Sequence, residues 1–328
     1  MHILITGAAG MIGRKLTERL AADGGLDGAA ISRLTLTDVV PPMRPKEFSG
    51  EAETLTSDLS APGEAERILA SRPDTIFHLA AIVSGEAEAD FDKGYRINLD
   101  GTRALLEAIR RTGDGYRPKF VFTSSVAVFG APFPDIIGDE FHLTPLTSYG
   151  TQKAIGELLL ADYHRRGLLD GVGIRLPTIC VRPGKPNKAA SGFFSSIIRE
   201  PLVGEEAVLP VPDSVCHTHA TPRSAVGFLI HAAGLSREAL GPRINLTMPG
   251  VSCTVAEQID ALRRIAGDKV AARIRREPDD TIARIVSGWP TRIGGNRARE
   301  LGFRAETTFD AIIRTHIDDE LGGRIAAA

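Results

Sequence analysis

The opening stretch "HILITGAAGMIG" constrains the fold more than any other part of the sequence. Residues 2–6 are rich in aliphatic and β-branched side chains and predict a buried strand, and Gly7, Gly10 and Gly13 follow directly. Glycine permits the tight turn, lets backbone amides approach a pyrophosphate, and allows the helix predicted at 11–22 to pack closely. The start of that helix favours the same anion. The stretch therefore predicts a dinucleotide-binding strand–turn–helix unit.

Apolar runs and amphipathic segments alternate through the first half of the chain. The runs lack a clean two-residue alternation, as expected for strands that are buried on both faces. We expect strands at 2–6, 33–38, 52–57, 74–80, 119–125 and 171–177. We expect helices between them at 11–22, 62–71, 95–112 and 148–166. This order predicts an α/β fold, a doubly wound parallel sheet of the Rossmann type with right-handed crossovers.

The Pro- and Gly-rich piece "LPTICVRPGKPN" (176–187) marks a change of character. Beyond it lie more loops and shorter elements, with helices expected near 222–235, 254–266 and 307–321. We expect a nucleotide-binding domain at 1–180, with later pieces around 212–247. A smaller, interleaved C-terminal substrate lobe would then comprise 181–211 and 248–328.

Composition excludes several classes of protein. The 328 residues carry 39 basic and 41 acidic side chains, a net charge of −2, which gives no electrostatic case for a nucleic-acid partner. No apolar run approaches the length of a membrane span. The three cysteines are far apart, which fits a reducing compartment. Because the first residues already read as a strand, we expect no removable presequence and a cytoplasmic location.

Asp38 ends the second predicted strand and indicates which dinucleotide binds. A carboxylate there accepts hydrogen bonds from both ribose hydroxyls of adenosine and repels a 2′-phosphate, so NAD is favoured over NADP. The alternative is an aspartate that only caps backbone amides. Asp58, after the third strand, is a weaker candidate at the adenine rim because aspartate also caps helices.

The segment "TSYGTQKAIGELLLADYH" puts Tyr149 four residues before Lys153 on a predicted helix. Residues at that spacing share one helix face. A surface pair of this kind arises often by chance. The alternative is that the ammonium turns the phenol, which ordinarily titrates near ~10, into a usable base. Ser124 and Ser125 end the strand at 119–125, on the edge of the sheet where ligands bind in such folds.

Together these motifs resemble the extended short-chain dehydrogenase/reductases. The resemblance covers nearly the whole chain and includes "FHLAA" after the fourth strand, "NLDGT" at 98–102, "RLP" at 175–177 and the closing "RARELGF". It implies that Tyr149 is the catalytic base, that Lys153 activates it and binds the nicotinamide ribose, and that Ser125 is the catalytic hydroxyl. If the match to the family motif is shifted by one residue, Ser124 and not Ser125 is the catalytic hydroxyl. Asn98 matches an asparagine that helps to position the lysine.

The resemblance also implies the cofactor contacts and an oligomeric state. The expected NAD contacts are Gly7, Gly10, Met11, Ile12, Gly13, Asp38, Asp58, Leu59, Ala80, Asn98, Tyr149 and Lys153. With Ile155, Leu158 and Leu159, the helix has more apolar surface than one core-facing side needs. With the helix at 95–112 they would form a homodimer contact, which light scattering can test.

The family contains dehydrogenases, epimerases and dehydratases. Ser125–Val126–Ala127 replaces the Thr-Asp-Glu typical of dehydratases, so water elimination lacks an evident proton donor. Thr178 stands where many nucleotide-sugar enzymes have asparagine, and Thr221 and Pro222 replace the usual aspartates of the next lobe. These departures weaken the nucleotide-sugar reading but leave an epimerase with tightly bound NAD as an alternative. A non-catalytic NAD(H) sensor is a second one.

The closer likeness is to bacterial members that oxidise carbon 2 of a four-carbon sugar acid with NAD. It is carried by "FHLAAIVSGEAEADFDKGYRINLDGT" and "HTHATPRSAVGFL". A carboxylate substrate needs a cation or hydrogen-bond donors. The candidates are Arg182, Arg199 and Arg223, with Ser84, Ser125, Thr178, Ser191 and His219 as polar partners. His217 and His219 have no evident third ligand, so we expect no metal.

Overall fold

The computed structural model describes residues 1–184 and 190–325, which form two compact units. The first comprises residues 1–128, 147–176 and 226–246, and the second comprises 129–146, 177–225 and 247–328. The segments 129–146 and 212–225, together with residues 177–180, thus fall in the second unit, unlike the boundaries expected from sequence. Segment 129–146 is joined to the second unit by the Ile137–Ile293 bridge, and segment 212–225 contains a strand of its sheet.

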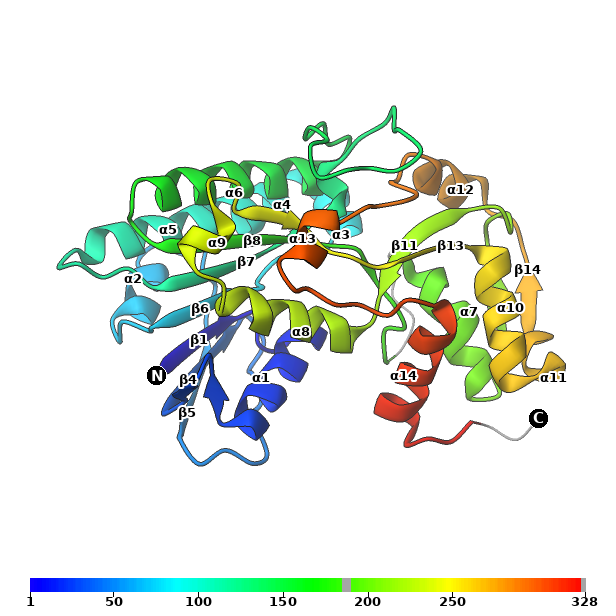
Figure 1. Cartoon of the computed structure of the whole chain (residues 1–328), viewed down its shortest axis with the longest axis horizontal. Helices are drawn as coiled ribbons and strands as arrows, with labels where there is room; N and C mark the ends of the chain where they lie inside the picture. Colours follow the sequence, from blue (N-terminus) through cyan, green and yellow to red (C-terminus); the bar gives the residue numbers. More distant parts are fainter. Residues whose placement is uncertain (185–189, 326–328) are drawn as a thin grey trace. The chain divides into compact units, whose positions relative to one another are not determined.

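A seven-stranded sheet forms the centre of the first unit (Figure 1). Its strands are β1 (His2–Thr6), β4 (Arg33–Asp38), β5 (Glu51–Thr56), β6 (Thr75–His78), β7 (Lys119–Ser125), β8 (Asp170–Leu176) and β12 (Asn245–Thr247). Their order is β12-β8-β7-β6-β1-β4-β5, and all pairs from β8 to β5 are parallel. The predicted doubly wound sheet is confirmed. Its order reverses between β1 and β6, which places a ligand-binding crevice at their carboxyl ends.

Helices cover both faces of this sheet, with α5 and α6 on one side and α1 and α8 on the other (Figure 1). The helices are α1 (Met11–Asp23), α2 (Glu64–Leu69), α3 (Ser84–Ala89), α4 (Phe91–Gly94), α5 (Gly101–Thr112), α6 (Ser148–Arg165), α8 (Pro222–Ala233) and α9 (Arg237–Leu240). A small hairpin pairs β2 (Gly25–Leu26) with β3 (Ala29–Ala30), and a 3₁₀ turn covers Val126–Val128. Every predicted strand and helix is present, with ends within two residues. The expected single helix at 95–112, however, begins with a π-helical segment, η1 (Tyr95–Asp100).

The second unit has two small sheets and its own core. β9 (Thr178–Ile179), β11 (Cys216–Ala220) and β13 (Val251–Thr254) form one sheet, and β10 (Ala207–Leu209) pairs with β14 (Ile274–Arg276). Its helices are α7 (Gly192–Leu202), α10 (Val255–Ala266), α11 (Asp268–Ala271), α12 (Asp280–Ser287), α13 (Asn296–Glu300) and α14 (Phe309–Leu321). Apolar side chains of α7, α10 and α14 form the main buried cluster.

None of the helices in the described part of the chain is both long and apolar enough to span a bilayer.

Two histidines lie inside the second unit. The His217 ring stacks on Phe194 and bonds to the Pro290 carbonyl and to Thr178, and His219 contacts the rings of Phe194 and Phe309. Burial lowers the pKa of His217 to about 4 and holds the pKa of His219 well below its ordinary value, with His217 adding to the latter effect. Both imidazoles are therefore neutral at pH 7.

We expect mild acid to destabilise the protein, because protons bind to the unfolded histidines near pH 6.5 and to the folded ones only at lower pH. Stability is then lost as pH falls below the unfolded value. His219→Leu removes one of these groups, so its melting temperature should fall less than that of the wild type between pH 7 and pH 5. Thermal melts across that range provide the measurement. Parallel curves for the two proteins would contradict the assignment of His219 as an acid-sensitive group.

Candidate functional site

The turn after β1 requires glycine at two positions. Gly7 has φ +74°, and a Cβ added there would lie 2.7 Å from the amide nitrogen of Ala80. A Cβ at Gly13 would lie 2.2 Å from the carbonyl oxygen of Gly7. The first glycine thus allows the turn to touch the loop after β6, and the third allows α1 to pack against the turn. Gly10 precedes α1 without a side-chain cap hydrogen bond, as expected for a helix start that binds an anion.

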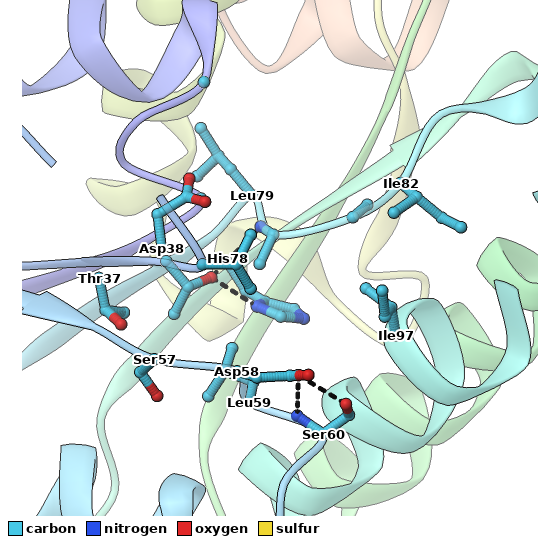
Figure 2. A pocket seen from close by; sticks show the side chains of 16 residues that line it. Thr37, Asp38, Ser57, Asp58, Leu59, Ser60, His78, Leu79, Ile82 and Ile97 are labelled. Atoms are coloured by element: carbon cyan, nitrogen blue, oxygen red, sulfur yellow. Dashed lines mark hydrogen bonds between the residues drawn. The ribbon is translucent and has the colours of Figure 1, made fainter. Parts of the chain in front are cut away.

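A cavity of about 160 Å³ lies at the carboxyl ends of β1, β4, β5 and β6 (Figure 2). This is the crevice expected where the strand order reverses. Of the predicted cofactor contacts, six line it: Gly7, Gly10, Asp38, Asp58, Leu59 and Ala80. Met11 and Ile12 form the first turn of α1 next to it. The glycine cradle, the helix start and the strand-end carboxylates together fit the pyrophosphate and adenosine of a dinucleotide.

Asp38 has both a structural and a ligand-facing position. Its carboxylate accepts hydrogen bonds from the amides of Ala9 (3.0 Å) and Val40 (3.3 Å) while lining the cavity. The bond from Ala9 ties the acid to the glycine turn. A carboxylate has about four acceptor sites, so these two bonds leave capacity for ribose hydroxyls.

Asp58 lies at the opposite rim and is directed at Ser60 (Figure 2). Its second oxygen lies 2.8 Å from the Arg96 guanidinium. Burial opposes ionisation of this acid, but the hydrogen bonds from Ser60 and Arg96 outweigh it and lower the pKa. Asp58 is therefore ionised and ion-paired with Arg96 at this rim.

His78, which the sequence analysis did not single out, is buried and lines the cavity (Figure 2). Thr102 donates to the Asn98 carbonyl, so its oxygen accepts from His78 Nε2, and Nδ1 in turn accepts from Thr6. Burial, reinforced by Lys153, lowers the pKa of His78 to about 3. This neutral imidazole links β1, β6 and α5 at the wall of the cavity.

The structure brings Tyr149 and Lys153 together on α6. Lys153 is 3% exposed, and its Nζ donates to the Thr123 carbonyl at 2.8 Å. The same Nζ lies 5.7 Å from the centre of the Tyr149 ring and 4.9 Å from that of Phe122. Burial lowers the pKa of Lys153 to about 8, against the opposing charge of Glu157. An ammonium shielded in this way interacts strongly with the few groups that touch it.

The two serines at the end of β7 have different surroundings. Ser124 is buried and its hydroxyl donates to Glu157 at 2.5 Å, and Arg175 binds the same carboxylate at 2.7–3.1 Å. Ser125, on the opposite face of the strand, is half-buried and accepts from the amide of Ala127 at 3.2 Å. The Ser124 hydroxyl is thus committed to Glu157, which leaves Ser125 as the candidate for the catalytic hydroxyl.

Asn98 lies in the π-helical segment η1. Its Oδ1 accepts from the Ile82 amide at 2.9 Å, and its Nδ2 donates to the Ile82 carbonyl and to Gln152 Oε1. The bond to Gln152 links Asn98 to α6 at the residue that precedes Lys153. The sequence analysis missed both the π-helical segment and Gln152.

The predicted substrate residues are spread over both units. Ser84 opens α3 in the first unit, and the rest, except Ser125, belong to the second. There Thr178 bonds to His217, Arg182 donates to the Ile179 carbonyl, and Ser191 precedes α7.

Three other predicted substrate residues also have partners within the second unit. Arg199 is paired with Glu200 in a largely buried site, and Arg223 pairs with Asp319 on the surface. His219 is fully buried and bonds to Gln258. Each side chain is used internally by the second unit. Across residues 1–184 and 190–325, no group of three or more histidines, cysteines or acids is arranged to hold a metal ion.

Residues 3–215 match the NAD dependent epimerase/dehydratase family, and the chain belongs to this family. It is an NAD-dependent oxidoreductase of the extended short-chain type. D-erythronate dehydrogenase of Cupriavidus necator is 48% identical, covering 97% of this chain and 98% of the relative. D-erythronate dehydrogenase of Haemophilus influenzae is 40% identical, covering 98% and 100%.

A solved structure from Agrobacterium tumefaciens, described as a nucleoside-diphosphate-sugar epimerase, is 66% identical to this chain. The match covers 99% of this chain and 96% of that one, with a TM-score of 0.98. The relatives thus agree on fold and family, whereas their names differ in the reaction.

We expect Asp38→Ala to weaken NAD binding by about tenfold or more, because the ribose hydroxyls would lose their hydrogen bonds to a charged acceptor and tenfold corresponds to about 1.4 kcal/mol. NADP, whose 2′-phosphate this acid repels, should lose much less. Isothermal titration with both dinucleotides measures the difference. Asp38→Asn is the matched control, because it keeps an acceptor for the Ala9 amide. Equal losses for NAD and NADP would show that Asp38 only holds the turn.

Proposed function

We propose that the protein oxidises the C2 hydroxyl of a short sugar acid of the D-erythronate type to the 2-oxo acid, with NAD as the oxidant. The observation that carries this proposal is the buried Lys153 ammonium beside Tyr149, at the sheet edge where Ser125 ends β7. Two nearly full-length relatives named D-erythronate dehydrogenase support the substrate class. The overall change is 2-hydroxy acid plus NAD⁺ to 2-oxo acid, NADH and one proton.

Each residue has a defined task in this reaction. NAD, when bound, supplies the hydride acceptor. Tyr149 accepts the proton of the substrate hydroxyl as a general base, and the neighbouring Lys153 cation favours the phenolate that this role needs. Ser125 holds the reacting oxygen in line and donates to it as charge develops. The amides at the start of α1, with Asp38, hold the dinucleotide.

A nucleotide-sugar epimerase is the second candidate, favoured by the description of the Agrobacterium tumefaciens structure. An epimerase keeps its reduced cofactor bound and returns the hydride, whereas a dehydrogenase releases NADH. Mixing the protein with NAD and D-erythronate and following NADH absorbance separates the two. UDP-sugar turnover without free NADH would support the epimerase. A sensor that binds NAD(H) without chemistry would do neither, and it would have no need for Ser125, Tyr149 and Lys153 together.

Tyr149→Phe should abolish turnover while leaving NAD binding intact. The phenylalanine keeps the ring that packs near Lys153 but removes the proton acceptor. Steady-state NADH production and NAD titration of the same preparation provide the two readouts. A variant that retained most of the wild-type kcat would exclude Tyr149 as the base.

Lys153→Met should lower turnover at least about a hundredfold, since general acid–base groups contribute roughly 10²–10⁴. The same change should leave the melting temperature at pH 7 equal or higher. The folded pKa of about 8 lies below the ordinary 10.5. The cost of burying this cation is therefore fully present below pH 8, and it falls as pH rises from there toward 10.5.

Lys119→Met is the matched control for this test. Lys119 is also a poorly exposed lysine, but it pairs with Asp170 and the Leu235 carbonyl away from the site. Its removal should lower the melting temperature and spare turnover. If Lys153→Met lowered stability and kept turnover, Lys153 would be a structural lysine rather than an activator.

A further inference from the structure

Gln152 is a fully buried amide that the reaction described above does not use. It precedes Lys153 on α6 and lies three residues after Tyr149, on the inner face of that helix. Methionine or leucine would fill such a position without any polar atom to satisfy. The polar side chain at this point of the active-site helix therefore requires a separate explanation.

The orientation of Gln152 is set by a chain of hydrogen bonds that starts at the cofactor cavity. The backbone of Ile82, which lines that cavity, both donates to and accepts from the Asn98 side chain, so the Asn98 amide has a single consistent orientation. Asn98 Nδ2 then donates to Gln152 Oε1 at 2.8 Å. Turning the glutamine over would place two donors against each other.

This orientation leaves Gln152 Nε2 buried with no hydrogen-bond partner in the described part of the chain. It faces the Cα of Gly94, where an added Cβ would lie 2.7 Å from Nε2. An unsatisfied buried donor costs free energy. Gln152 therefore keeps the hydrogen bond from Asn98 to its Oε1 while its own Nε2 stays unsatisfied. Stability alone does not account for glutamine here.

We propose that Gln152 is a positioning residue that fastens α6 to the wall of the cofactor cavity through Asn98 and so sets Lys153 beside Tyr149. The bond reaches the helix one residue before Lys153 and less than one turn after Tyr149. The Lys153 ammonium is otherwise held by the Thr123 carbonyl on β7 and by two ring faces. The helix backbone must therefore be seated correctly for the cation to reach the phenol.

A second contact seats the same end of α6. Glu88 on α3 accepts from the Ser148 amide at 2.9 Å, at the first residue of the helix. α3 and α4 both pack on α6 there, and Gly94 ends α4 against Gln152. The segment 82–94 thus contacts α6 at its start and at Gln152, and Ile82 begins that segment in the cavity wall. Through Asn98, Gln152 therefore connects α6 to the cavity wall at Ile82.

The test compares Gln152→Met with Gln152→Glu. Methionine preserves length and apolar packing but cannot serve as the acceptor for Asn98, whereas glutamate keeps an acceptor oxygen. The inference rests on the proposed dehydrogenase reaction, so one readout is independent of activity. It is the pH dependence of Lys153 acylation, followed by mass spectrometry in the full-length protein. The others are kcat, KM for D-erythronate, NAD affinity and the melting temperature.

We expect Gln152→Met to melt at or above the wild-type temperature and to bind NAD within about twofold of the wild type. Its kcat should fall about tenfold or more, because small displacements of catalytic groups have effects of that size. KM should change little, and the acylation midpoint of Lys153 should move. Gln152→Glu should recover most of the lost kcat, and its Lys153 midpoint should lie above that of the Met variant because of the added negative charge.

A Met variant whose kcat and Lys153 acylation profile both stay within about twofold of wild type would overturn the inference. If that variant fails to fold, Gly94→Ala displaces the same amide from the other side and should give the same loss of kcat at unchanged KM; wild-type values there would overturn it equally. If the wild type releases no NADH from D-erythronate, the proposed function fails. The acylation profiles still decide the role of Gln152 in that case.

Discussion

The interaction on which the proposed chemistry depends is the burial of one ammonium group beside one phenol. Lys153 has lost nearly all contact with water, which disfavours its charge and lowers its pKa. The carbonyl of Thr123 and the faces of Phe122 and Tyr149 replace that water. The arrangement works only if β7 and α6 keep a fixed separation. Gly156 permits this, since a Cβ there would lie 2.8 Å from the Phe122 ring.

The strand order brings the predicted cofactor-binding groups of the protein together. Gly7, Asp38, Asp58 and Ala80 are far apart in sequence but follow four strands that are adjacent in the sheet. Their side chains and amides therefore converge on one cavity without any long loop. The same edge of the sheet carries Ser125 at the end of β7. The predicted cofactor-binding and catalytic groups thus share one rigid support, as precise positioning requires.

Much of the fold and of the cofactor cavity was predictable from the sequence, because both depend on local patterns. The strand–helix alternation, the glycine turn and the position of Asp38 each have a signal within a few residues. The π-helical segment has none: its wide turn is stabilised by Asn98 bonds to Ile82 and Gln152, which are distant in sequence. Gln152 did have a signal, since it shares the inward spacing of α6 with Lys153 and Glu157. The partners of Arg223 and His219 likewise have no local signal, because Asp319 and Gln258 are distant in sequence.

Glu157 shows how the same helix keeps its charges apart. It lies one turn beyond Lys153, and a free carboxylate there would draw the ammonium away from Tyr149. Arg175 binds both of its oxygens, and Ser124 donates to one of them. With its acceptor sites occupied, Glu157 offsets part of the charge of Lys153 from a distance without forming a direct ion pair. The two neighbouring serines of β7 thus differ: Ser124 donates to Glu157, and Ser125 ends the strand at the edge of the sheet.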